Sequence, residues 1–255
     1  MILNAIEMGE GRPAVLLHGL FGQARNFGFV QRRLVGPERR LIALDLRNHG
    51  ASPHAPGMHY RDLAADVIET LGAMGALPAA LIGHSMGGKV AMAAALTAPD
   101  AVTRLMVADI APVASASRFT AIIAAMQQIP LTPDLTRAEA DHALAEAEHD
   151  PAVRAFLLQN LRFGAGPAWR VGLAELADGL PDILDWPEFA ATYDGPTLFL
   201  AGDRSDYIKP EHRPIIRALF PRVRMASLRN AGHWLHADNP EGFIAVADAF
   251  LTPQP

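Results

Sequence analysis

Short apolar runs that alternate with helix-like patterns constrain the fold of this 255-residue chain most strongly. Such alternation is typical of a mostly parallel β-sheet that carries helices on both faces. The runs are almost continuously hydrophobic, as expected of central strands buried on both sides. The last helix is predicted to begin with Asn239 as its N-cap and Pro240 as its first residue. The predicted strands are Ala14–His18, Leu41–Leu46, Ala79–His84, Arg104–Ile110, Pro196–Gly202 and Arg224–Leu228.

The alternation stops between about Pro112 and Pro187, where the sequence is mainly helical in character. Thr136 and Glu139 have the spacing of a capping box, and Asp150-Pro151 is typical of another helix start. A helical insertion between two strands has to rest on the edge of the sheet, so we interpret it as a lid. The predicted division is a core of residues 1–112 and 191–255 and a lid of residues 113–190.

The sequence Gly83-His84-Ser85-Met86-Gly87 lies between an apolar run and an alanine-rich helical run. G-x-S-x-G between a strand and a helix is typical of a nucleophile elbow, a strained turn that exposes the serine Oγ at the sheet edge. The motif alone arises often by chance, so the surrounding strand and helix carry the prediction. Ser85 is therefore the candidate nucleophile.

A serine hydroxyl is a weak nucleophile and needs a nearby base. The late segment Asn230–His236 contains two candidates, His233 and His236. His233 follows a glycine that can aim its side chain back across the sheet edge, and it lies 148 positions after the serine. We predict that His233 is the base and that His236 is a supporting loop residue.

A carboxylate is needed to orient the imidazole and to stabilise its charged form. Asp109 is one candidate, because an apolar strand delivers it to the carboxyl edge of the sheet, where ligands bind in open α/β folds. Asp203 and Asp206, in the loop after the next strand, are the alternatives.

Acyl transfer also requires hydrogen-bond donors for the negative oxygen that develops in the transition state. The segment His18–Gly22 follows an early strand, and its glycines leave the backbone accessible. We expect the backbone N–H groups of Leu20 and Met86 to form this oxyanion hole. Met86 begins a helix, whose dipole favours negative charge at that end.

Apolar side chains of the inserted segment and of the catalytic loops are candidates for the wall of an acyl pocket. Most side chains of the insertion are expected to pack the lid against the core. The predicted pocket residues are Phe21, His84, Phe119, Phe156, Trp169 and Trp234.

Composition argues against several other functions. A net charge of −5 is unfavourable for nucleic-acid binding, which needs clustered lysine and arginine. The chain has no cysteine, which excludes disulfides, thiolate nucleophiles and cysteine-bound zinc. The sequence contains no H-E-x-x-H pattern that would indicate a zinc site. No signal peptide or membrane-spanning run is visible. We therefore predict a cytoplasmic protein with no metal or cofactor and no membrane partner.

These features, in this order, resemble the α/β-hydrolase superfamily over nearly the whole chain. The closer resemblance is to small bacterial esterases of the YbfF type and their mitochondrial relatives. It implies Ser85 as nucleophile, His233 as base and an acyl ester as substrate. The segments that carry it are Leu17–Gly22, Arg47–Gly50, Gly83–Lys89, Asp109–Pro112 and Gly232–Trp234.

The resemblance also bears on the acid. Most of the superfamily carries Gly-x-x-Asp after the seventh strand, but here Ser205 stands three positions after Gly202. YbfF-type esterases tend to lack that acid and to carry an aspartate in the Asp-Ile-Ala-Pro segment. The resemblance therefore favours Asp109, although Asp203 and Asp206 flank the usual position.

The predicted activity is that of a serine carboxylesterase or thioesterase, which cleaves small acyl esters through an acyl-enzyme. Hydrolysis of a carbon–carbon bond or a lyase reaction with the same triad is the alternative. A ligand receptor without catalysis is a further one, although such receptors usually lack a triad member. We expect a monomer or a small homo-oligomer.

Overall fold

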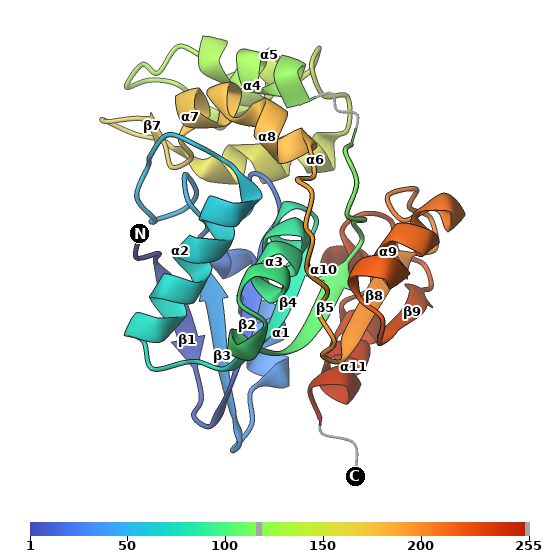
Figure 1. Cartoon of the computed structure of the whole chain (residues 1–255). Coiled ribbons are helices and arrows are strands. Elements are labelled where there is room, and N and C mark those ends of the chain that lie inside the picture. The colour runs from blue at the N-terminus through green and yellow to red at the C-terminus, as the bar shows by residue number, and fades with distance from the viewer. Residues whose placement is uncertain (116–118, 253–255) are drawn as a thin grey trace.

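The computed structural model describes residues 1–115 and 119–252, which form an α/β fold around a seven-stranded sheet (Figure 1). The strands lie in the order β1 (Ala5–Met8), β3 (Arg39–Leu44), β2 (Arg12–Leu17), β4 (Ala79–His84), β5 (Val102–Ala108), β8 (Thr197–Gly202) and β9 (Val223–Leu228). Only β1 pairs antiparallel with its neighbour among these described strands, and the other pairs are parallel. The predicted fold class is confirmed.

Helices cover both faces of the sheet. Helices α2 and α3 lie on one face, and α1 and α11 lie on the other (Figure 1). Side chains of each central strand alternate between the two cores, as Val15 and Leu16 of β2 show. This double burial explains the continuous hydrophobic runs. The helices are α1 (Gly28–Leu34), α2 (Tyr60–Ala73), α3 (Met86–Thr97), α9 (Arg213–Leu219), α10 (Leu235–Asp238) and α11 (Pro240–Leu251), with 3₁₀ turns η1 (Ala24–Phe27), η2 (Pro99–Ala101) and η4 (Pro210–His212).

The two edge strands differ from the prediction. Strand β1 was not predicted, because it is only four residues long and none of its side chains is fully buried. Strand β9 was predicted as buried on both faces, but most of its residues are partly or fully exposed, since it has a neighbour on one side only. The predicted start of the last helix is confirmed, since Asn239 Oδ1 accepts a hydrogen bond from Gly242 N at 2.9 Å.

The chain between β5 and β8 packs over the carboxyl ends of the strands, at the top of Figure 1. The predicted helix starts at Thr136 and Asp150 are confirmed, because each side chain accepts a hydrogen bond from a backbone N–H of its helix. A small hairpin interrupts the predicted helical character of the segment. The segment contains α4 (Phe119–Gln128), α5 (Arg137–Leu144), α6 (Pro151–Leu157), η3 (Leu158–Asn160), β6 (Leu161–Arg162), β7 (Ala168–Trp169), α7 (Leu173–Asp178) and α8 (Leu180–Leu184). Its separation from the core as a lid stays a prediction.

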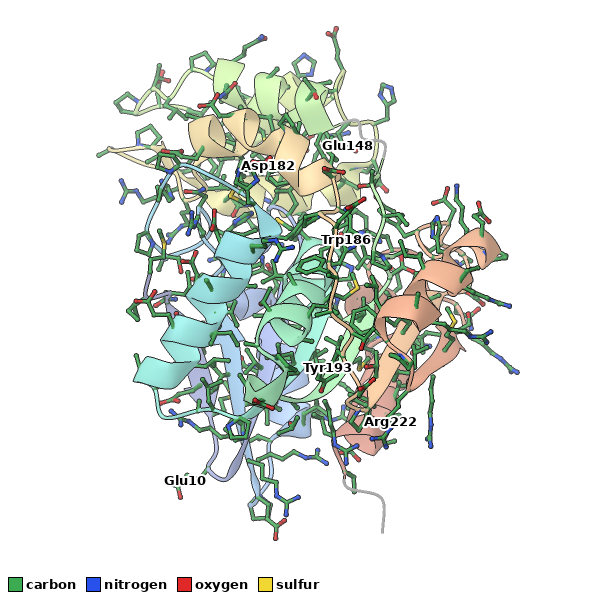
Figure 2. All side chains as sticks on the ribbon, in the orientation of Figure 1. Glu10, Glu148, Asp182, Trp186, Tyr193 and Arg222 are labelled. Carbon is green, nitrogen blue, oxygen red and sulfur yellow. The ribbon has the colours of Figure 1, made fainter. Side chains whose placement is uncertain are left out.

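The two ends of this segment are tied to each other and to the sheet. Ser115 N donates to Leu184 O at 2.7 Å, so the outgoing and returning chains meet. The buried Lys89 ammonium of α3 donates to Asp185 O at 2.8 Å. Tyr193, which Figure 2 labels on the path back to β8, donates its hydroxyl to the backbone of β5 at 2.9 Å. These bonds fix where the segment leaves and rejoins the sheet.

Candidate active site

Ser85 occupies a sharp turn between β4 and α3. Its φ of 52° and ψ of −121° are unfavourable for a residue with a Cβ and match the strained turn that the motif predicts. A Cβ on Gly83 would lie 2.2 Å from Gly87 O, and one on Gly87 would lie 2.4 Å from Leu17 O. Only glycine fits at these two positions, which explains why the motif brackets the serine with them.

His233 lies in the loop between β9 and α10 and reaches back across the sheet edge. Its Nε2 is 2.9 Å from Ser85 Oγ, and its Nδ1 is 2.8 Å from Asp109 Oδ2. His84, the second residue of the serine motif, donates its Nε2–H to His233 O at 2.7 Å. The motif therefore anchors the histidine loop as well as the serine.

Asp109 follows β5 directly and is completely buried. Its Oδ1 accepts a hydrogen bond from Gly202 N at 2.9 Å, and its Oδ2 accepts from the hydroxyl of Ser205 as well as from His233. Both carboxylate oxygens thus accept hydrogen bonds. Its φ of 53° turns the chain sharply at the end of the strand.

The two alternative carboxylates lie elsewhere. Asp203 is exposed, and it accepts the backbone N–H groups of Asn230 and Ala231 at 3.0 and 3.1 Å, which organises the loop that precedes His233. Asp206 is also exposed. Among these three carboxylates, Asp109 is the one that accepts the hydrogen bond from His233.

The turn after β2 lies against Ser85. A Cβ on Gly19 would be 3.1 Å from Ser85 Cβ, so glycine permits the close approach. Gly22 N donates to Gly19 O at 2.9 Å, and the φ of 62° at Phe21 corresponds to the third position of a type II turn. A left-handed conformation costs a residue other than glycine about 1–2 kcal/mol.

The backbone N–H groups of Leu20 and Met86 were predicted as oxyanion donors. Within residues 1–115 and 119–252, neither group donates to a protein acceptor. Met86 is the first residue of α3, where helix geometry leaves the N–H unpaired and the dipole is positive. Their role as oxyanion donors stays a prediction.

Three buried imidazoles and the partly buried His236 surround these residues. Burial, with neighbouring imidazoles as a second cause, lowers the pKa of His49 to about 3 and that of His236 to about 4. Burial also lowers the pKa of His18 and, assisted by His233 and His236, that of His84. These four rings are therefore neutral at neutral pH. His236, the rival base, packs its ring 5.0 Å from those of Phe27 and His84.

A cavity of about 600 Å³ opens beside Ser85, between the sheet edge and the inserted segment. The predicted pocket residues Phe21, His84, Phe119, Phe156 and Trp234 line it. Further lining comes mainly from apolar side chains of the insertion and from neutral imidazoles, together with the buried Glu148. Figure 2 labels Glu148 in the inserted segment. The lining residues outside the prediction include Phe27, Ile122, Val153, Leu157, Tyr207 and His236.

Trp169 does not line this cavity, contrary to the prediction. It belongs to β7, where it pairs with Leu161 of β6, and it is not among the residues that line the cavity. The prediction placed Trp169 at the pocket because it is an aromatic residue in a mainly helical insertion. The hairpin that holds Trp169 could not be recognised from the sequence, since each of its strands has only two residues.

Two contacts of the candidate site were not predicted. Ser205, noticed only as a departure from the usual Gly-x-x-Asp pattern, donates to Asp109. The ring of Tyr207 stacks on the His233 imidazole, with centroids 3.9 Å apart and an interplanar angle of 16°. The position of Ser205 after Gly202 was the available signal for the first contact, and no motif marked the second.

No helix in the described ranges combines the length and apolar composition that crossing a membrane requires.

The alpha/beta hydrolase family matches residues 14–246 of the chain. The sn-1-specific diacylglycerol lipase ABHD11 of Danio rerio is 42% identical over 253 residues, which cover 96% of this chain and 80% of the relative. Esterase YbfF of Escherichia coli is 37% identical, over 94% of this chain and 92% of the relative. The solved structure of a marine microorganism esterase superposes with a TM-score of 0.93 at 33% identity and covers 98% of this chain and 99% of its own.

Proposed function

The chain belongs to the alpha/beta hydrolase family and is a carboxylic-ester hydrolase, and from this premise we propose that it cleaves small acyl esters through a Ser85–His233–Asp109 triad and an acyl-enzyme. The observation that carries the proposal is the hydrogen-bonded chain from Ser85 Oγ through both nitrogens of His233 to Asp109 Oδ2, at 2.9 and 2.8 Å. The three residues come from loops up to 148 positions apart, so chance proximity is a poor explanation.

In the proposed mechanism, His233 Nε2 takes the proton of Ser85 as Oγ attacks the acyl carbonyl. Asp109 accepts the Nδ1–H of His233, which keeps Nε2 unprotonated before the attack and stabilises the imidazolium afterwards. The N–H groups of Leu20 and Met86 stabilise the tetrahedral oxyanion.

The intermediate then collapses: the carbonyl re-forms, the ester C–O bond breaks, and His233 donates its proton to the departing alcohol. Water, deprotonated by the same histidine, attacks the acyl-enzyme, and Ser85 regains its proton as the acid leaves. A thioester would follow the same steps with a thiol as leaving group.

The apolar lining of the 600 Å³ cavity supports an acyl or alkyl chain as the group held beside Ser85. Phe156 and Leu157 of the inserted segment would contact that chain. One relative is named as a diacylglycerol lipase, so a short-chain diacylglycerol belongs in the substrate panel with p-nitrophenyl esters and acyl-CoA thioesters.

A fluorophosphonate probe tests the nucleophile directly. We expect the protein to become labelled and to hydrolyse p-nitrophenyl butyrate, and Ser85→Ala to abolish labelling and lower kcat/KM at least about 10⁴-fold. Ser227→Ala, in the exposed part of β9, is the matched control and should behave like the wild type.

Two results would refute this proposal. Labelling or ester hydrolysis that persists in folded Ser85→Ala would exclude Ser85 as nucleophile. Turnover of a vinylogous diketone, with no ester or thioester hydrolysed, would favour a carbon–carbon bond hydrolase instead.

A further inference from the structure

The turn at Gly19–Gly22 is held by two side chains from distant parts of the chain. His49 Nε2 accepts the N–H of Phe21 at 3.1 Å, and Asn160 Nδ2 donates to Phe21 O at 2.8 Å. Together these bonds fix the peptide groups on both sides of Phe21, in the left-handed conformation that residues with a Cβ adopt rarely. The amide of Leu20 belongs to the adjacent peptide group. The direction of the Leu20 N–H therefore depends on these two hydrogen bonds.

Asn160 is fully buried, at the end of η3 in the inserted segment, 139 positions after Phe21. Its Nδ2 also donates to Leu157 O at 3.2 Å, and its Oδ1 accepts from Gln23 Nε2 at 2.6 Å. Both carbonyl partners of Nδ2 can only accept, so the amide has one consistent orientation. Two of its three hydrogen bonds, to Phe21 O and from Gln23 Nε2, join the insertion to the turn and the residue after it.

The same short piece of the insertion forms part of the cavity wall. Phe156 and Leu157 line the cavity, and Leu157 O is itself bonded to Asn160. The wall that would hold the substrate and the turn that would hold its oxygen are thus connected through one side chain.

We propose that Asn160 is a positioning residue, which directs the Leu20 N–H toward the oxygen of the reacting ester by fixing the Phe21 carbonyl. The inference rests on the proposed function, in which Ser85 is the nucleophile and Leu20 an oxyanion donor. Asn160 touches no reacting atom and acts through the backbone of the turn.

The test is Asn160→Asp, which keeps the size and the acceptor but replaces the donor to Phe21 O by an oxygen. We expect kcat for p-nitrophenyl butyrate to fall about 10–100-fold and KM to change less than about threefold. This fall in kcat does not exceed the fall that removal of a whole oxyanion donor causes. The affinity for a trifluoromethyl ketone, whose adduct with Ser85 carries the same oxyanion, should fall in parallel. A purely structural role would not produce this pattern.

Gln23→Ala keeps the inference testable if Asn160→Asp does not fold, because it leaves the Asn160 side chain in place and removes the donor to its Oδ1, together with a longer bond of 3.5 Å from Gln23 Nε2 to Gln159 O. A smaller loss of kcat and of ketone affinity, in the same direction, is expected. Gln159→Ala is the control: its exposed side chain accepts from Asn26 Nδ2 at 2.9 Å and bridges the same two segments without touching the turn. It should retain wild-type kcat and ketone affinity.

Folded Asn160→Asp or Gln23→Ala with wild-type kcat and ketone affinity would overturn the inference, as would an equal loss in Gln159→Ala. These outcomes differ from failure of the proposed function. That failure would appear as hydrolysis by Ser85→Ala, or as a wild-type protein that neither hydrolyses an ester nor accepts the fluorophosphonate.

Discussion

The substitution Asp109→Asn tests which carboxylate serves His233, and the surroundings of Asp109 determine how the new amide would sit. Gly202 N–H donates to Oδ1 at 2.9 Å, so the amide oxygen of asparagine would keep that position. The amide nitrogen of the asparagine would then face His233 Nδ1 and would present an N–H donor to it in place of the carboxylate acceptor. The imidazole is driven to the tautomer with its proton on Nε2, which cannot accept the proton of Ser85.

The equivalent exchange in a serine protease leaves the geometry intact and lowers kcat about 10⁴-fold, through the same change of tautomer. We expect a loss of that order here, corresponding to about 5–6 kcal/mol in transition-state stabilisation. Asp206→Asn changes an exposed carboxylate and should alter kcat/KM less than about threefold.

The assay is kcat/KM for p-nitrophenyl butyrate, with circular dichroism to verify that each variant is folded. The double variant Asp109→Asn with Ser205→Asp provides a second measurement, because Ser205 already donates to the oxygen that His233 contacts. A carboxylate at position 205 should restore at least about tenfold of the lost rate. A folded Asp109→Asn within tenfold of the wild type, or a larger loss in Asp206→Asn, would refute the reasoning.

Two further predictions concern stability. Burial lowers the pKa of His236 to about 4 from its ordinary 6.5, so between these pH values the unfolded chain binds a proton that the folded chain does not. The free energy of unfolding therefore falls as the pH drops through this window. In urea titrations, His236→Phe should remove about 1.4 kcal/mol per pH unit of that slope. Parallel slopes for the two proteins would contradict this. Gly83→Ala should destabilise by at least about 2 kcal/mol because its Cβ would strike the backbone at Gly87 O, whereas Gly36→Ala, with no atom within 4 Å of its Cβ, should stay within about 0.5 kcal/mol. Similar midpoints in denaturant for both glycine variants would show that the elbow tolerates a Cβ.

The central part of the fold could be predicted from the sequence because it depends on local patterns. Strands such as β4 are buried on both faces and therefore appear as unbroken apolar runs. The edge strands could not be predicted as well, since β1 is short and half-buried, and most residues of β9 are partly or fully exposed. Their place in the sheet is determined by pairing with distant strands rather than by their own composition.

Much of the candidate site could be predicted for a similar reason. The positions of Ser85, Asp109 and His233 follow from where strands end, and parallel strands bring their carboxyl ends to one edge. Contacts between side chains that no motif relates could not be anticipated. Asn160 meets Phe21 across 139 positions, and its role depends on how η3 packs on the turn, which periodicity does not encode.

The closed base of the inserted segment has a consequence for engineering. Ser115 and Leu184 bring its two ends together through a backbone hydrogen bond, and Ser85, His233 and Asp109 all lie outside it. The segment can therefore be treated as an exchangeable cassette: a graft from another esterase would replace one wall of the cavity and leave the residues around the serine in place. Since Asn160 reaches from the cassette into the turn at Phe21, a graft without an equivalent amide would change chain-length preference and also lose rate.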